Sequence, residues 1–185
     1  EQALSESEGM EDICEVMRVC TDRCFSMSRF ITRFADVVKI PEPHLVPVNL
    51  NDLVFSCKRF MEGMCADRNI TITLDIDEEL GEVKLDVALF EQVLVNIIKN
   101  AAESIEQNGE IKIRTYSPGG IEVADNGKGI TKETEAKLFS PFFSTKPNGQ
   151  GIGLIFIREV LMRHGCSFSL RTYADGWTRF RMLFN

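Results

Sequence analysis

Two asparagines in an apolar stretch are the first residues of this sequence that suggest chemistry. Asn96 and Asn100 are four positions apart in "LVNIIKNAAESI", residues 94–105, so a helix places both on one face. Asparagine is a poor helix-interior residue because its amide competes for backbone hydrogen bonds. An amide oxygen suits Mg²⁺, which keeps several waters and shares phosphate oxygens. The pair therefore indicates a magnesium site, and a solvated polar stripe with Gln92 and Glu103 is the alternative.

A carboxylate further along the chain suggests a second binding group. Asp125 ends an alternating segment and is followed at once by "NGKGI". At a strand end beside Gly127 and Gly129, it can point into a pocket that the glycines keep open. Because an ionised aspartate only accepts hydrogen bonds, we expect it to bind a donor such as an exocyclic amine. The alternative is an ordinary turn aspartate.

A glycine-rich segment follows 22 residues after the first. Gly149, Gly151 and Gly153 alternate in "PNGQGIGL", directly before an apolar helical pattern. Backbone N–H groups that precede a helix N-terminus form a cradle for anions. The segment therefore predicts a phosphate site, and a mobile surface loop is the alternative.

The stretch before that loop, "FSPFFSTK", is aromatic and ends in a lysine. A cluster of three phenylalanines is unusual in a plain loop: Phe139, Phe142 and Phe143. We expect a lid whose phenylalanines dock on the domain while Lys146 reaches a phosphate.

The elements that position these residues begin with a long helix. Residues 13–38 carry apolar residues spaced by alternating fours and threes, namely Ile13, Met17, Cys20, Cys24, Met27, Ile31, Phe34 and Val38. This 3.5-residue repeat is typical of a coiled-coil or bundle seam and implies a partner helix. A helix packed on its own domain is the alternative. Prolines at 41, 43 and 47 favour an extended linker, so we divide the chain into residues 1–46 and 47–185.

Mixed helix and strand patterns follow the linker. We expect Asn51 to cap one helix and Asp86 to cap a longer one that reaches about Ile105. Alternating segments predict strands at 70–76, 82–86, 110–116, 119–125, 167–173 and 178–184. A further helix is expected from about 152 to 164. The predicted class is α+β: a two-layer α/β sandwich with a mixed, mostly antiparallel sheet, preceded by one long heptad-patterned helix.

Composition excludes several classes of protein. The 185 residues are 44% hydrophobic and 26% charged, as in a soluble protein with a core. A net charge of -7 argues against a nucleic-acid surface. No apolar run reaches the ~18 residues of a membrane span, and no signal peptide is recognisable. Six cysteines without zinc spacing indicate reduced, mostly buried thiols in a cytoplasmic protein. The first residue, Glu1, suggests a piece of a longer chain, whose membrane anchor would lie outside it.

Four segments occur in one order: "NIIKNA", "DNGKG", "FSPFFSTK" and "GQGIGL". They resemble the N box, first glycine box, F box and second glycine box of bacterial sensor histidine kinases, in the GHKL ATPase superfamily. The similarity covers about residues 47–185, and "DGWTRFRMLF" resembles the family's final strand. The short lid after Lys146 resembles that of compact nitrogen-regulation-type kinases. The resemblance implies transfer of the γ-phosphoryl group of MgATP to a histidine and then to a response regulator.

The resemblance also implies roles for individual residues. Asn100 would bind Mg²⁺, Asn96 would hold its water or the phosphates, and Lys146 would approach the γ-phosphate. Asp125 would accept the adenine N6 amine, with Thr178 nearby. The remaining positions implied for the nucleotide are Gly127 and Gly129 around the base, and Phe142, Gly149, Gly151 and Gly153 at the lid and phosphates.

The heptad helix resembles the second helix of the family's dimerisation and phosphoacceptor hairpin. The first helix, which carries the phosphorylatable histidine, is not in this sequence, and neither His44 nor His164 matches it. We therefore expect a chain that binds ATP without autophosphorylating. The resemblance also implies a homodimer that forms through the heptad helix and the missing hairpin helix. A serine kinase of the anti-sigma-factor type and a non-catalytic nucleotide-sensing module are the alternatives.

Overall fold

The computed structural model describes residues 2–38, 40–140, 143–145 and 151–184, and in the first helix the side chains of residues 12–28, 31 and 32. The chain forms two compact units, residues 1–39 and 40–185. Within the described residues no helix combines the length and apolar character that crossing a membrane requires. They also contain no cluster of three or more histidine, cysteine or acidic side chains that could hold a metal ion.

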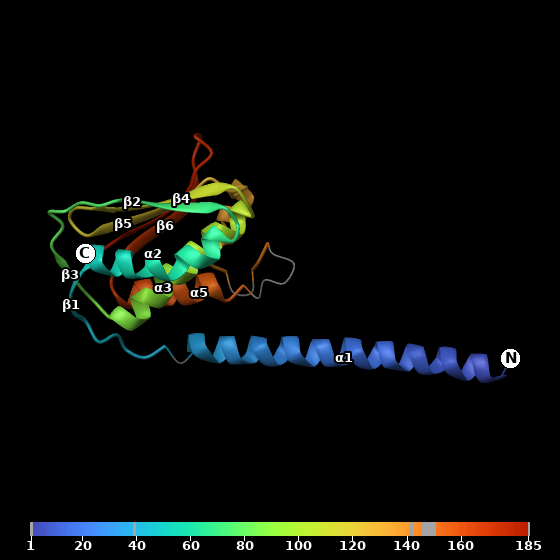
Figure 1. The fold of residues 1–185 in the computed structure, drawn as a ribbon. Coiled ribbons are helices and arrows are strands. Elements are labelled where there is room, and N and C mark those ends of the chain that lie inside the picture. The colour runs from blue at the N-terminus through green and yellow to red at the C-terminus, as the bar shows by residue number, and fades with distance from the viewer. Residues whose placement is uncertain (1, 39, 141–142, 146–150, 185) are drawn as a thin grey trace. The chain divides into compact units, whose positions relative to one another are not determined.

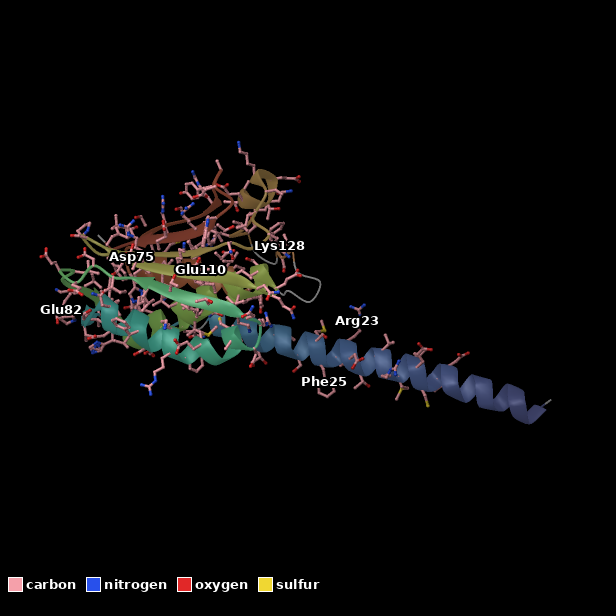
Figure 2. All side chains as sticks on the ribbon, turned by 45° about the horizontal axis from the view of Figure 1, so that its top comes forward. Arg23, Phe25, Asp75, Glu82, Glu110 and Lys128 are labelled. Carbon is pink, nitrogen blue, oxygen red and sulfur yellow. The ribbon has the colours of Figure 1, made fainter. Side chains whose placement is uncertain are left out.

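The first unit is a single helix, α1 (Gln2–Val38). The seam residues Ile13, Met17 and Ile31 are all more than half exposed in it. Figure 2 shows the side chains of Arg23 and Phe25 extending away from the same helix. The exposed apolar residues of α1 form a surface that a second helix could cover. The last two predicted seam side chains, Phe34 and Val38, lie outside the described residues.

The second unit is a two-layer sandwich, as predicted. Its main sheet has the order β2-β4-β5-β7-β6, with β2 parallel to β4 and the other neighbours antiparallel. The strands are β2 (Ile70–Asp75), β4 (Gly109–Tyr116), β5 (Gly120–Asp125), β6 (Ser167–Thr172) and β7 (Thr178–Leu183). A separate antiparallel pair joins β1 (Val46–Asn49) to β3 (Glu82–Leu85).

Three helices cover one face of the main sheet (Figure 1): α2 (Leu50–Ala66), α3 (Val87–Ile105) and α5 (Gly153–Arg163). A short helix, α4 (Lys132–Glu135), lies between β5 and α5 in the chain. The core lies between the layers, where Phe90 and Ile98 of α3 and Ile111 of β4 are fully buried. Burying such side chains contributes about 1.5–3 kcal/mol each and fixes α3 against the sheet.

Helix caps agree with the sequence in one case and correct it in another. The Asp86 side chain accepts a hydrogen bond from the Leu89 N–H (3.1 Å) and caps α3. The predicted cap Asn51 is wrong, because Asn49 caps α2 instead. Asn51 is buried, and its amide pairs with the Thr115 hydroxyl (2.7 Å) and with the carbonyl oxygen of Asp77 (2.9 Å).

The proline-rich linker belongs to the second unit. Ile40 is buried there, and the His44 N–H donates to the second oxygen of Asp86 (2.9 Å). Arg163 near the end of α5 donates to the carbonyl oxygen of Pro41 (3.4 Å). The linker is therefore bound to the start of α3 and the end of α5.

The cysteines divide equally between the two units. Cys57, Cys65 and Cys166 are buried in the sandwich, whereas Cys14, Cys20 and Cys24 are exposed on α1. The expectation of mostly buried thiols is thus wrong for the cysteines of α1. Burial raises the pKa of Cys57 to about 11 and that of Cys166 to about 12.

Candidate functional site

A cavity lies between the C-terminal half of α3 and the ends of β5 and β7. Its walls are mostly apolar, and it is lined by Ile97, Asn100, Ala101, Ser104, Val123, Asp125, Gly129, Ile130, Leu154, Leu170, Thr178 and Phe180. Four of the predicted site residues therefore meet here: Asn100, Asp125, Gly129 and Thr178. The cavity measures about 80 Å³, below the roughly 300–1,000 Å³ of a complete small-molecule site. A cavity of this size can hold only part of such a ligand.

Asp125 is the charged residue of this cavity. Its side chain is 6% exposed and lies at the end of β5, as the alternating pattern predicted. One oxygen, Oδ1, accepts hydrogen bonds from the Ser104 hydroxyl (2.6 Å) and the Gly127 N–H (3.0 Å). Burial raises the pKa of Asp125, and the hydrogen bonds from Ser104 and Gly127 act in the opposite direction.

Thr178 lies directly across from Asp125, since their Cα atoms are register partners in β5 and β7. Its hydroxyl is 2.9 Å from that of Thr172 on β6. The Thr172 hydroxyl also accepts the Ile130 N–H (2.7 Å). Thr172 thus ties the loop after β5 to the two last strands, a role that the sequence did not reveal.

The glycines after β5 are required by contacts within the protein. A Cβ atom on Gly127 would lie 2.6 Å from the carbonyl carbon of Ser104, so a glycine lets the loop approach α3. The Lys128 N–H completes that contact by donating to the Ser104 carbonyl oxygen (3.2 Å). Gly129 has φ 76°, a left-handed conformation that favours glycine, and it lines the cavity.

The two asparagines are placed differently. Asn100 lines the cavity, whereas Asn96 is half-buried one turn earlier and outside its walls. The Asn96 amide donates to the carbonyl oxygen of Gln92 (2.8 Å), which fixes its NH₂ group on its own helix. Ser104 is four residues after Asn100 and completes the same face. The spacing of 96, 100 and 104 was the signal that could have found it.

Part of the lid is described. The Phe139 ring packs edge-on against Phe168 at 5.3 Å, and Arg158 of α5 donates to the carbonyl oxygen of Phe139 (3.2 Å). Gly151 has a left-handed φ of 65°, and a Cβ atom on Gly153 would meet no atom of the described residues within 4 Å. Three predicted site residues, Phe142, Lys146 and Gly149, lie outside the described residues.

Both ring nitrogens of His164 are used inside the fold. Nε2 accepts the Asp86 N–H (3.0 Å), so the Nδ1–H donates to the carbonyl oxygen of Val160 (2.7 Å). The ring also lies against Phe90, with 6.0 Å between centroids. This histidine joins the ends of α3 and α5 and is not presented to a ligand.

The fold is that of a known class of two-layer ATPase domains. A protein-family model described as "Histidine kinase-, DNA gyrase B-, and HSP90-like ATPase" matches residues 85–185. The chain belongs to this family, and the resemblance read from the sequence is confirmed.

Individual relatives are sensor kinases. Sensor histidine kinase ZraS of Salmonella typhimurium is 28% identical over 165 residues, which cover 87% of this chain and 35% of ZraS. The catalytic domain of histidine kinase ThkA is 30% identical with a TM-score of 0.68, over 75% of this chain and 93% of that domain. ThkA in complex with the response regulator TrrA gives a TM-score of 0.72 at 26% identity, over 90% of this chain and 50% of that one. The chain thus spans about a third of the length of the curated relative.

Proposed function

We propose that this chain is the nucleotide-binding part of a sensor histidine kinase. It binds MgATP with the adenine in the α3–β5–β7 cavity. In the whole protein, the γ-phosphoryl group passes to a histidine outside this chain and then to the receiver domain of a response regulator. The family match and the kinase relatives support this proposal. The observation that carries it is the buried carboxylate of Asp125 in an apolar cavity.

The residues fit an adenine nucleotide. Asp125 accepts a hydrogen bond from the exocyclic amine, while the side chains of Ile97, Leu154 and Phe180 contact the faces of the ring. Guanine presents a carbonyl oxygen at that position, which repels the carboxylate. A hydrogen bond to a charged group is worth ~1.5–3 kcal/mol, so we expect a roughly tenfold to hundredfold preference for adenine.

Three polar residues along one face of α3 span a length similar to that of a nucleotide. A helix rises 1.5 Å per residue, so Ser104, Asn100 and Asn96 extend over about 12 Å from the base end of the site. Along this helix we assign Mg²⁺ to Asn100, and a water of the ion or a phosphate to Asn96. Bound Mg²⁺ would neutralise phosphate charge, and the protein's own contribution to transfer is positioning. Lys146 and Gly149 are proposed for the phosphates, with Gly151 and Gly153.

Self-association is the second part of the proposal. The exposed apolar residues of α1 support pairing with helices of a second copy, so that the intact kinase would be a homodimer. Neither histidine of this chain is proposed as the acceptor, because His164 is bound on both nitrogens and His44 lies between prolines. The chain is expected to bind ATP without autophosphorylating. Acid-labile radiolabel on this chain after incubation with labelled ATP would contradict that expectation.

Calorimetric titration with a non-hydrolysable ATP analogue tests the proposal. We expect binding that is tighter with Mg²⁺ and much weaker for the GTP analogue. Asn100→Ala is expected to remove the Mg²⁺ dependence, and Gln92→Ala, an exposed polar residue of the same helix, is the matched control. The absence of nucleotide binding by the unsubstituted chain would refute the proposal.

A further inference from the structure

The protein itself occupies one oxygen of the Asp125 carboxylate. Oδ1 accepts both the Ser104 O–H (2.6 Å) and the Gly127 N–H (3.0 Å). A distance of 2.6 Å is typical of a hydroxyl that donates to an ionised carboxylate. Two donors use both lone pairs of this oxygen. In the part of the chain that the structure describes, Oδ2 receives no hydrogen bond.

The second oxygen is therefore a buried acceptor at the wall of the cavity. Asp125 is 6% exposed, and both it and Ser104 line that cavity. A buried charged acceptor without a partner is unfavourable, so the site gains free energy from a ligand that brings a donor to Oδ2. A hydroxyl on α3 and a backbone N–H of the loop thus decide which oxygen is left for the ligand.

We propose that Ser104 is a positioning residue that sets the base specificity of this site. By binding Oδ1, it turns Oδ2 of Asp125 toward the base, so that the site selects a purine with an amino group at position 6. This inference rests on the proposed function, since it concerns the same cavity. Ser104 acts through Asp125 and is not itself expected to contact the amine.

The geometry has a sharp consequence for Asp125→Asn. Ser104 and Gly127 both donate, so the amide oxygen of the asparagine must take the place of Oδ1. Its NH₂ group then takes the place of Oδ2 and faces the base. The group presented to the ligand changes from an acceptor to a donor. The preference is expected to invert from a 6-amino purine to a 6-oxo purine.

Three nucleoside diphosphates that differ only at position 6 provide the test: ADP, inosine diphosphate and purine riboside diphosphate. Each is titrated calorimetrically into the whole chain and into Ser104→Ala, Asp125→Asn and the control Ser56→Ala, an exposed serine of α2. The unsubstituted chain should prefer ADP roughly tenfold to hundredfold. Ser104→Ala should weaken ADP about three- to tenfold and leave purine riboside diphosphate unchanged. Asp125→Asn should bind the inosine nucleotide more tightly than ADP.

The pH dependence of ADP affinity shows whether Ser104 positions Asp125 or only fills space. Loss of the Ser104 donor lets the pKa of Asp125 rise further, because burial is then opposed by one hydrogen bond fewer. On acidification, Ser104→Ala should therefore lose ADP affinity at a higher pH than the unsubstituted chain. A serine that only filled space would not move this midpoint.

Failure of the proposed function and failure of the role of Ser104 give different results in these titrations. If the unsubstituted chain binds none of the three nucleotides, the proposed function fails and this inference with it. If ADP is preferred but Ser104→Ala keeps the same ADP preference and the same pH midpoint, only the role of Ser104 is overturned. Continued preference of Asp125→Asn for ADP also overturns it. Thermal unfolding of each variant shows that the comparison is between folded proteins.

Discussion

Gly127 and Gly153 are two glycines of the proposed site with opposite surroundings. A Cβ atom on Gly127 would meet the Ser104 backbone at 2.6–2.7 Å, whereas one on Gly153 would meet no atom of the described residues within 4 Å. Gly127→Ala must therefore push the loop away from α3, and we expect a loss of about 2 kcal/mol or more in unfolding free energy. Gly153→Ala should change it by less than about 1 kcal/mol. Urea denaturation of both variants measures the difference, and equal effects would contradict this account.

Glu106 is a residue in a strained conformation. It has φ 68° and ψ -69°, and the N–H of Gln107 donates to the carbonyl oxygen of Ile105 (2.9 Å) in a tight γ-turn. Because such a conformation costs a non-glycine residue about 1–3 kcal/mol, Glu106→Gly should stabilise the fold by about 1 kcal/mol. The control Glu78→Gly lies in a turn without positive φ and should destabilise slightly. A fall in the urea midpoint of Glu106→Gly would refute the expectation.

Residue types pointed to four of the residues that line the candidate site, Asn100, Asp125, Gly129 and Thr178, because their chemistry is distinctive. A carboxylate at a strand end and amides inside an apolar helix are unusual enough to point to Asp125 and Asn100. Ser104 escaped notice because a hydroxyl near a helix end is common. The close approach of Gly127 to α3 depends on two segments 23 residues apart, and no local pattern contains that distance. Asn51 was misassigned for the same reason, since its partner Thr115 is 64 residues away.

The start of α3 is the element that connects the linker to the site. Asp86 caps the helix and accepts the His44 N–H, and hydrogen bonds from His44 and then Leu89 lower its pKa. A lowered pKa contributes stability above the unfolded-state pKa, and this contribution disappears as the pH falls through the folded-state value. Asp86→Ala should therefore cost about 1 kcal/mol at pH 7, with a smaller difference near pH 3. The control is Asp52→Ala, which changes an exposed aspartate of α2. If the loss of unfolding free energy in Asp86→Ala did not depend on pH, the charge of Asp86 would not be its cause.

Elements with strong local signals were predicted well. The hairpin between β6 and β7 turns at Asp175 and Gly176, as the sequence indicated. Helix α5 begins at Gly153, one residue from the predicted start at about residue 152. The short helix α4 was not predicted, because four residues are too few for a periodic pattern. The pairing of β2 parallel to β4 was also beyond the pattern, since it requires α3 to cross between them.

Across the whole molecule, the exposed seam of α1 predicts self-association. Met17→Glu with Ile31→Glu places charges on the predicted seam, and we expect this double variant to sediment as a monomer while the unsubstituted chain forms dimers. Phe25→Glu changes an equally exposed residue outside the seam and should leave the dimer intact. Residues 40–185 alone should be monomeric and bind ADP, because this unit has its own core. Sedimentation velocity measures the oligomeric state of each variant. A double variant that is still dimeric would show that this seam is not the dimer interface.

The division of the cysteines gives the two units separate chemical reporters. A maleimide added to the folded chain should modify Cys14, which is exposed and outside the seam, within minutes. Cys20 and Cys24 belong to the seam and should react as quickly only in the chain whose α1 is unpaired, such as the double variant. Cys57, Cys65 and Cys166 can react only when the sandwich opens, and burial raises the pKa of each thiol. Mass spectrometry of the labelled chain would thus measure how fast residues 40–185 open, from the rate at which labels beyond the third appear. Bound nucleotide would show itself as a slower fourth, fifth and sixth label, without any engineered probe.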